Sequence, residues 1–204
     1  MKNFAIFCLF LLALVFVNSS FAAEESCLPN GKDKIATDSL FCDYYPNGKL
    51  KGELHLKNRK MDGPIKNYYE NGTIKEEGTF KDGKQEGLFK SYYESGALQG
   101  EVFFKDGKQE GIAKAYHENG KLQEEGTLKE GKQDGLIKGY YENGNLQVER
   151  IFKNGKQEGQ GKFYDENGTL IVTVEYKNDS PVSGICLDCD GIERPLTKDE
   201  LSEF

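Results

Sequence analysis

The chain contains no tryptophan, and its 204 residues include only 2 histidines and 2 methionines. The histidines, His55 and His117, are far apart in the sequence, which leaves little for a histidine-based catalytic or metal centre. The formal net charge is −7, so the chain supplies no positive field for a nucleic acid or an anionic membrane surface. These shortages exclude nucleic-acid binding, disfavour membrane binding and predict no cofactor and no metal.

Long apolar runs are also scarce. The one such run, Phe4–Val17, follows the basic residue Lys2 and is too short to span a bilayer comfortably. Ser20 and Ala22 place small side chains where a signal peptidase needs them. We therefore expect residues 1–22 to be a signal peptide and the mature protein to be exported, either to the periplasm or to the cell surface and medium. A retained N-terminal anchor is the alternative.

Glycine is abundant, with 24 residues, and the glycines mark an internal repeat. The pattern Tyr-x-x-Asn-Gly returns every 24 residues, and a second turn pattern, typified by Lys81-Asp82-Gly83-Lys84, lies between copies. Asn-Gly and Asp-Gly accept positive φ and form tight hairpin turns. The chain is therefore predicted to be all-β, an elongated, single twisted antiparallel β-meander of about six stacked hairpin repeats. The copies start at Tyr44, Tyr68, Tyr92 (where Ser95 replaces the Asn), Tyr116, Tyr140 and Tyr164.

Between the turns the residues alternate with the period of a strand. Val102 and Phe104 fall on one side and Phe103 on the other. Pairing across the Asp-Gly turns predicts that one face carries Phe80, Phe104, Leu128 and Phe152 and that the leading tyrosines lie on the other face. Both faces would then be partly aromatic, which requires the sheet to curl or to pack on a partner.

Copies such as that from Tyr68 to Gly87 resemble the bacterial variant of the MORN (membrane occupation and recognition nexus) repeat, and the resemblance covers Tyr44 to about Gly184. The turn glycines, aromatic residues and spacing agree over consecutive copies. The resemblance implies an extended β-meander used for binding and scaffolding, without catalysis. Some members of this bacterial family are labelled antitoxin-like. That label conflicts with the predicted signal peptide, because an exported protein cannot neutralise a toxin in the cytoplasm.

The repeat sets the expected domain boundaries. We expect a signal peptide at 1–22, an N-terminal cap at 23–43, the repeat domain at 44–184 and a C-terminal cap or tail at 185–204. The first copy has Asn58-Arg59-Lys60 where Asp-Gly-Lys is expected. Terminal copies that depart from the repeat pattern in this way are typical of caps.

Four cysteines, Cys27, Cys42, Cys186 and Cys189, are candidates for disulfides, because an exported chain meets an oxidising compartment. A Cys27–Cys42 bridge would staple the N-terminal cap, while unpaired thiols or pairing with the distant cysteines are the alternatives. Cys186 and Cys189 form a C-x-x-C motif, which we interpret as a structural disulfide in the C-terminal cap. The alternative is a thiol–disulfide oxidoreductase, although no strand-then-helix pattern surrounds the pair.

The repeat also stacks like side chains into lines. We expect the tyrosine side chains to pack inside the protein; the alternative is that they form an exposed stripe that binds a partner. The candidate interface residues are Tyr68, Tyr69, Tyr92, Tyr93, Tyr116, Tyr140 and Tyr141. The charged lines are interpreted as a solvated face whose neighbouring columns have opposite sign, with a polyion site as the alternative. They comprise Lys66, Lys90, Lys114, Lys138 and Lys162, and Asp62, Glu86, Glu110, Asp134 and Glu158.

An active site needs unlike groups that converge on one point, whereas this sequence repeats like residues along a line. No catalytic residue is therefore predicted. We expect an exported non-enzymatic scaffold that binds a protein partner, or a second copy of itself, through its extended sheet. The alternatives are the thiol oxidoreductase and a membrane-associated or antitoxin-like MORN protein.

Overall fold

The computed structural model describes residues 38–187 and 191–204. Most of them belong to one antiparallel sheet of 16 strands, so the predicted all-β class is confirmed. The strands are β1 (Asp38–Tyr44), β2 (Leu50–Lys57), β3 (Lys60–Tyr68), β4 (Ile74–Lys81), β5 (Lys84–Gln85), β6 (Gly87–Tyr92), β7 (Leu98–Lys105), β8 (Lys108–Tyr116), β9 (Leu122–Lys129), β10 (Lys132–Tyr140), β11 (Leu146–Lys153), β12 (Lys156–Gln157), β13 (Gly159–Tyr164), β14 (Leu170–Lys177), β15 (Ser180–Leu187) and β16 (Glu193–Pro195), and α1 (Lys198–Leu201) follows them.

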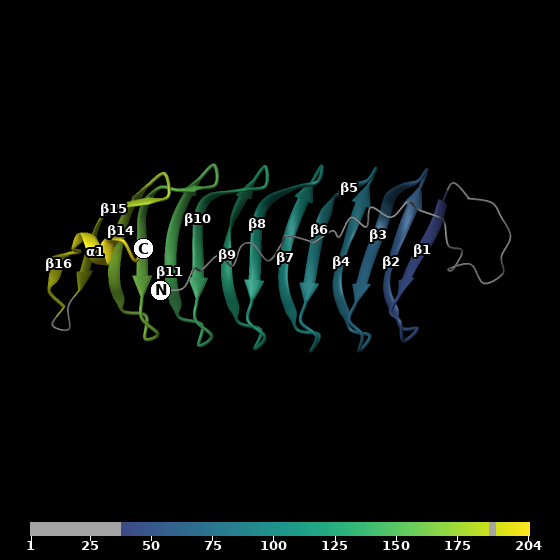
Figure 1. The fold of residues 1–204 in the computed structure, drawn as a ribbon, viewed down its shortest axis with the longest axis horizontal. Helices are drawn as coiled ribbons and strands as arrows, with labels where there is room; N and C mark the ends of the chain where they lie inside the picture. Colours follow the sequence, from purple (N-terminus) through teal and green to yellow (C-terminus); the bar gives the residue numbers. More distant parts are fainter. Residues whose placement is uncertain (1–37, 188–190) are drawn as a thin grey trace.

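The sheet is a meander in which strands that follow one another in the chain lie side by side. The order runs from β1 to β16 without a crossover, and the short strands β5 and β12 pair with β4 and β11 off the main path. Because consecutive strands pair with each other, the strands lie side by side along one long axis, roughly perpendicular to it. The molecule is therefore elongated, as the repeat predicts (Figure 1).

Both predicted turns are present, and each needs the residue types that predicted it. At the Asp-Gly turn, φ is 50° at Asp82 and 85° at Gly83, the left-handed geometry of a type I′ hairpin turn. At the Tyr-x-x-Asn-Gly turn, the Tyr69 N–H donates to the Thr73 carbonyl at 2.9 Å, and Gly72 has a φ of 94°. Glycine adopts such values at little steric cost, which explains its place in each copy.

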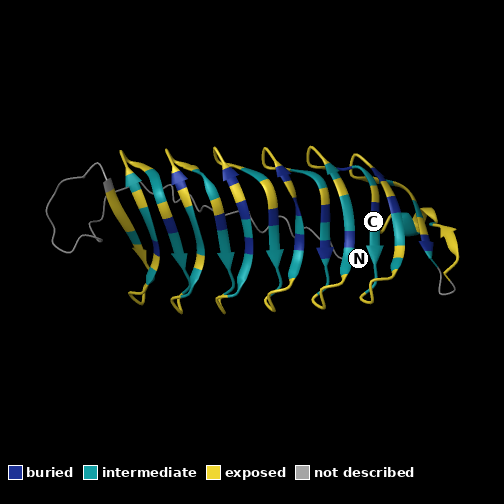
Figure 2. Ribbon diagram, turned by 180° about the vertical axis from the view of Figure 1, so that it is seen from behind, coloured by how far each residue is buried: buried dark blue, intermediate teal, exposed yellow. Residues whose placement is uncertain are grey.

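Side chains alternate between two faces of the sheet, named here the core face and the outer face. On β7, Val102 and Phe104 are buried on the core face, whereas Phe103 between them is 44% exposed on the outer face. Figure 2 shows this alternation of buried and exposed residues along the strands. One cluster of buried core-face residues comprises Ile65, Phe80, Phe89, Val102, Phe104, Ala113 and Leu128.

Aromatic rings on the core face pack edge to face. The Phe89 ring centroid lies 5.8 Å from that of Phe80 and 4.9 Å from that of Phe104. Phe89 also lies over Gly78 of the neighbouring strand, where an added Cβ would come within 2.4 Å of the ring. Gly78 therefore makes room for the aromatic core, and Ile137 covers Gly126 in the same way two copies later.

The C-terminal segment folds back against the last strands. The Thr197 side chain accepts from the Glu200 N–H, and the Glu200 carboxylate accepts from the Thr197 N–H at 2.8 Å, which together form a capping box at the start of α1. Glu200 also pairs with Arg194 at 2.6 Å. The Phe204 ring packs edge-on against Phe163 at a centroid distance of 5.0 Å, so the chain end covers part of the core face.

Several expectations lie outside the described residues. The predicted signal peptide and Cys27 precede residue 38, and Cys189 falls in the gap at 188–190. Export and both disulfide pairings therefore stay predictions. Within the ranges that the structure describes, no helix has the length and apolar character needed to cross a membrane.

Candidate functional site

The leading tyrosines form a ladder on the outer face, as the register predicts. From Tyr68 to Tyr164, each hydroxyl donates to a glutamate carboxylate of the preceding copy, 15 residues earlier in the chain. The pairs are Tyr68–Glu53 at 2.7 Å, Tyr92–Glu77 at 2.6 Å, Tyr116–Glu101 at 3.2 Å, Tyr140–Glu125 at 3.0 Å and Tyr164–Glu149 at 3.0 Å. Burial and then the glutamate raise the pKa of Tyr68, Tyr92 and Tyr140 to about 12, so these hydroxyls stay protonated at neutral pH.

The second tyrosine of each doublet points to the opposite side of the strand. The hydroxyls of Tyr69 and Tyr93 donate to the backbone carbonyls of Tyr92 and Tyr116 at 2.8 and 2.7 Å. His117 takes this place in the fourth copy, with Nε2 3.0 Å from the Tyr140 carbonyl. The structure thus divides the candidate interface tyrosines into two ladders, both with hydroxyls used within the sheet. Their role in binding a partner stays a prediction.

Charged side chains form a second line on the outer face, named here the charge row. Lys90 of β6 lies opposite Glu77 and Glu101 of the two neighbouring strands, and the same alternation continues across the sheet. In order, the row is Glu53, Lys66, Glu77, Lys90, Glu101, Lys114, Glu125, Lys138, Glu149 and Lys162. The lysine line is therefore interleaved with acids, which supports a charge-balanced face over a polyion site.

Next to the charge row lies a line of exposed apolar side chains that sequence reasoning missed, named here the apolar row. Leu88 pairs with Phe103, Ile112 with Thr127, and Leu136 with Ile151 across neighbouring strands. The exposed fractions are 47% for Leu88, 44% for Phe103, 63% for Ile112, 45% for Leu136 and 43% for Ile151. The available signal was an apolar residue two positions from Lys90, Glu101, Lys114, Lys138 and Glu149 of the charge row, which places both on the same face.

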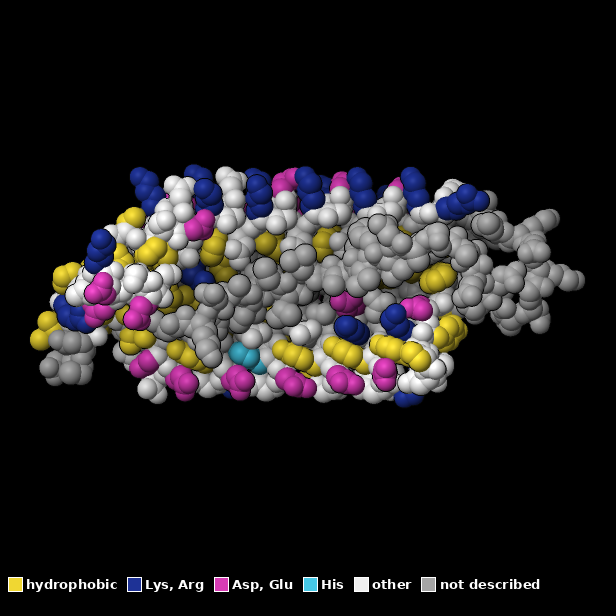
Figure 3. Space-filling view, in the orientation of Figure 1, with side chains coloured by type: hydrophobic (Ala, Val, Ile, Leu, Met, Phe, Trp, Pro, Cys, Tyr) yellow, Lys and Arg dark blue, Asp and Glu magenta, His cyan; other side chains and the backbone are white. Residues whose placement is uncertain are grey.

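The two long edges of the molecule carry different charges. Lysines gather along the edge of the Asp-Gly turns and acidic side chains along the other edge (Figure 3). Acids at the lysine-rich edge hold the turns of the next copy, as where Asp62 accepts from the Asp82 N–H at 3.1 Å. The same contact recurs as Glu86–Asp106, Glu110–Glu130, Asp134–Asn154 and Glu158–Asn178. These acids therefore have a structural role.

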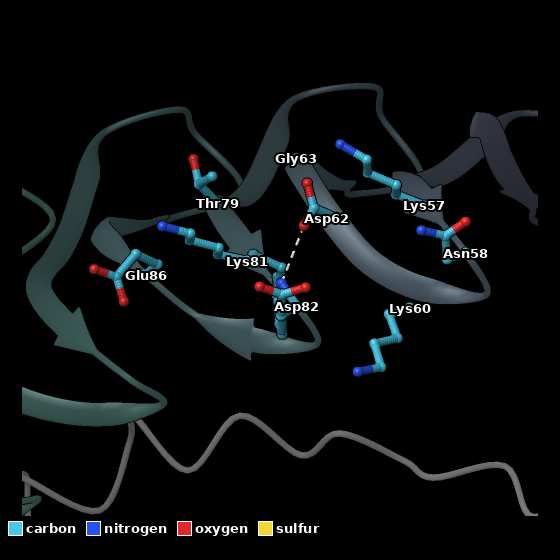
Figure 4. A pocket seen from close by; sticks show the side chains of 10 residues that line it. Lys57, Asn58, Lys60, Asp62, Gly63, Thr79, Lys81, Asp82 and Glu86 are labelled. Atoms are coloured by element: carbon cyan, nitrogen blue, oxygen red, sulfur yellow. Dashed lines mark hydrogen bonds between the residues drawn. The ribbon is translucent and has the colours of Figure 1, made fainter. Parts of the chain in front are cut away.

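An open depression of about 550 Å³ lies at the first of these turns (Figure 4). Its charged lining is mixed, since lysines and carboxylates alternate around it, and one carboxylate already binds the turn backbone. The charged residues of the lining are Lys57, Lys60, Asp62, Lys81, Asp82 and Glu86. This arrangement does not select one class of ligand.

Two buried polar residues interrupt the apolar core face, Glu124 and Gln157. Glu124 is only 6% exposed, and its partners in register are Ala115 and Gly139, whose side chains offer no hydrogen bond. The equivalent carboxylate two copies earlier, Glu76, accepts from the Asn67 amide at 3.2 Å. Burial raises the pKa of Glu124 to about 7, and Arg150 opposes that shift. Glu124 is therefore a buried carboxylate without the partner that its repeat position has elsewhere.

Cys186, the described half of the C-x-x-C motif, does not have the setting of a redox thiol. Cys186 is buried in β15, with its Sγ 3.7 Å from the Arg194 carbonyl, rather than at the start of a helix. Among the described residues, His, Cys, Asp and Glu form no group of three or more that could hold a metal ion.

Six consecutive stretches of the chain match the profile of the family described as MORN repeat variant, at residues 38–58, 61–82, 85–106, 109–130, 133–154 and 157–178. From residue 61 on, each match runs from one Asp-Gly-type turn to the next, so its phase differs from that of copies counted from the tyrosines. No curated protein gives a significant match to the chain. MORN repeats are commonly modules that bind proteins or membranes. Because the matches cover most of the chain and its repeats form the sheet, the protein belongs to the MORN repeat variant family.

Proposed function

We propose that the protein is an exported, non-enzymatic scaffold that binds a protein partner through the outer face of its sheet. The observation that carries this proposal is the apolar row, a line of large side chains that are 43–63% exposed in the middle of the sheet. Exposed apolar surface of this kind is characteristic of sites that bind other molecules. The row is bordered by charges, which resembles the apolar centre and polar rim of a protein interface.

The outer face offers a line of repeated contacts rather than a reaction centre. Tyr68, Tyr92, Tyr116 and Tyr140 lie beside the charge row on this face, and their rings extend the same surface. Their hydroxyls are already hydrogen-bonded to glutamates, so the rings rather than the hydroxyls are available for a partner. A surface that repeats along one axis suits an extended partner that contacts several copies.

The test is site-specific photocrosslinking in cells that express the chain with its natural N-terminus. Benzoylphenylalanine replaces Ile112 in the apolar row or, as a matched control, Val182, which is 53% exposed on β15 outside the row. We expect a defined protein adduct at position 112 and none at position 182. Adducts at neither position, or equally at both, contradict binding through the outer face.

Export is tested separately by fractionating the same cells and sequencing the N-terminus of the recovered chain. We expect a chain that begins at Ala23 outside the cytoplasm, because the predicted signal peptide ends at residue 22. A chain that keeps residues 1–22 and stays in the cytoplasm contradicts export while leaving the binding surface untouched.

A further inference from the structure

We propose that the partner of the outer face is a second copy of this chain, packed outer face against outer face about a two-fold axis that lies between the two sheets. This inference rests on the proposed function and names the partner of the same surface. Face-to-face packing of two sheets is a common way to bury two half-exposed faces, with strand directions within about 30° of each other.

The first argument is a pattern repeated on ten neighbouring strands of the sheet. On each strand from β2 to β13 on the main path, a middle residue on the outer face lies two positions from an acid and two positions from a lysine in the sequence; for β6 and β13 the acid, Glu86 or Glu158, stands just before the strand. On β7 these are Glu101, Phe103 and Lys105. The middle residues are His55, Pro64, Thr79, Leu88, Phe103, Ile112, Thr127, Leu136, Ile151 and Gln160, and all ten are exposed.

The second argument is that this pattern is complementary to itself. Because neighbouring strands are antiparallel, acids and lysines alternate along the charge row. At the Asp-Gly hairpins the register shifts, so Glu110 lies opposite Phe103 and Lys105 lies opposite Lys108. A two-fold axis parallel to the strands, between β8 and β9, places Lys114 of one copy opposite Glu125 of the other. An axis along the sheet places Lys114 opposite Glu110 of the same strand in the other copy. In both orientations Lys114 of each copy meets a carboxylate of the other copy.

The apolar row is brought into register by the same operation. With the axis between β8 and β9, Phe103 of one copy lies opposite Leu136 of the other, and Ile112 lies opposite Thr127. A two-fold interface is isologous, so each of these contacts occurs twice. The result is an apolar centre with opposite charges on both sides.

The third argument is that the charges of the charge row are largely unpaired within the sheet. Of this row, the described residues form one ion pair within 4.0 Å, Lys138 with Glu149 at 3.7 Å. The remaining lysines have their charge available to a facing carboxylate. The tyrosine hydroxyls hold the glutamates in place, so these carboxylates are oriented before a partner arrives.

The size of the surface fits a stable dimer. We count four strands on each side of the axis between β8 and β9. Eight strands spaced about 4.8 Å apart, each with three outer-face residues about 6.6 Å apart, cover roughly 760 Å² per copy. A standard specific interface buries about 800 Å² per partner. A partner of one charge sign, by contrast, would meet repulsion at every second strand, which a second copy of the chain avoids.

The test is light scattering during size-exclusion chromatography of the chain purified from the exported fraction, over a range of concentrations. We expect a dimer for the natural sequence and at least a tenfold weaker dimer for Ile112→Glu, whose carboxylate would enter the apolar centre twice. Val182→Glu, a change of equal chemistry outside the row, should leave the dimer intact. Circular dichroism shows whether each variant keeps its sheet.

A second measurement does not depend on a destabilising variant. Benzoylphenylalanine at position 112 of the purified chain should give an adduct of two chains, with the attached peptide drawn from strands β6 to β11. A monomer at every concentration, or attachment to a different part of the chain, overturns the dimer. If the purified chain is monomeric but position 112 attaches to another protein in cells, the dimer fails and the proposed function stands. If neither experiment gives an adduct, both fail.

Discussion

Tyr92 donates its hydroxyl hydrogen to a carboxylate oxygen of Glu77 at 2.6 Å, and this bond joins one copy of the repeat to the copy before it. The same contact links Tyr68 with Glu53 at 2.7 Å. A hydrogen bond to a charged acceptor contributes more than a neutral one. The tyrosine ladder therefore stabilises the stacking of copies from the outer face, while the aromatic rings of the core face stabilise it from the other side.

Removal of the Tyr92–Glu77 hydrogen bond should lower the stability of the folded protein. Tyr92→Phe keeps the ring and deletes the hydroxyl, so the free energy of unfolding should fall by about 1–2 kcal/mol. Urea unfolding measures the change. Glu77→Gln and the double variant complete a double-mutant cycle, in which the two single effects should not add. Additive effects would show that the hydroxyl and the carboxylate act independently.

The same ladder predicts how stability changes at alkaline pH. The pKa of Tyr68, Tyr92 and Tyr140 is raised from 10.0 to about 12, so the unfolded chain loses these protons at lower pH than the folded chain does. Folding is then favoured fully below pH 10, and the contribution is lost as the pH rises from about 10 to about 12. Absorbance of tyrosinate at 295 nm should show these residues titrating above the value of tyrosine in unfolded chain. Titration of all tyrosines near pH 10 would contradict the ladder.

The repeat made the fold predictable to the level of individual turns. Asp82-Gly83 and Asn71-Gly72 stand where the backbone needs positive φ or a tight turn, so local chemistry alone located the strands. The strand period then placed Phe104 on the core face and Tyr92 on the outer face, because that period is independent of tertiary contacts. The extra strands β1 and β16 at the ends lie where the copies are least regular, and the repeat did not predict them.

The candidate site was less predictable for a physical reason. The tyrosines are conspicuous in sequence, but which ladder faces outward depends on strand direction and on bulges such as the one between Ser91 and Tyr92. The sequence analysis did not identify the apolar row, because hydrophobic residues such as Leu88 and Ile112 can belong to either face, and only the folded sheet shows that they lie opposite the core. Burial is a tertiary property, and hydrophobicity at one position does not reveal which side of the sheet is covered.

The contact between Phe89 and Gly78 predicts a position where even alanine is poorly tolerated. A Cβ at residue 78 would lie 2.4 Å from the Phe89 ring, so the ring would have to leave its place between Phe80 and Phe104. We expect Gly78→Ala to lower the free energy of unfolding by about 1–3 kcal/mol, as overpacking does. In a Phe89→Leu background the smaller side chain should reduce that loss. An equal loss in both backgrounds would show that the ring is not its cause.

The buried Glu124 predicts an unusual pH dependence near neutrality. Burial raises its pKa from 4.5 to about 7, so between these values the folded protein holds a proton that the unfolded chain has released. The contribution of this group to stability is therefore greatest below about pH 4.5, and it falls as the pH rises to about 7. At higher pH the buried charge costs roughly 3 kcal/mol relative to an unperturbed carboxylate.

Two variants separate this effect from other titrating groups. Glu124→Gln has no proton to release, so urea unfolding should show a smaller loss of stability between pH 5 and pH 7 than in the natural sequence. Ala115→Asn places an amide opposite Glu124, as Asn67 lies opposite Glu76, and the hydrogen bond should lower the pKa of Glu124 and reduce the same slope. If the slope in Glu124→Gln equals that of the natural sequence, the loss of stability between these pH values arises from other groups. That result would mean that burial does not raise the pKa of Glu124 and does not lower the free energy of unfolding at neutral pH.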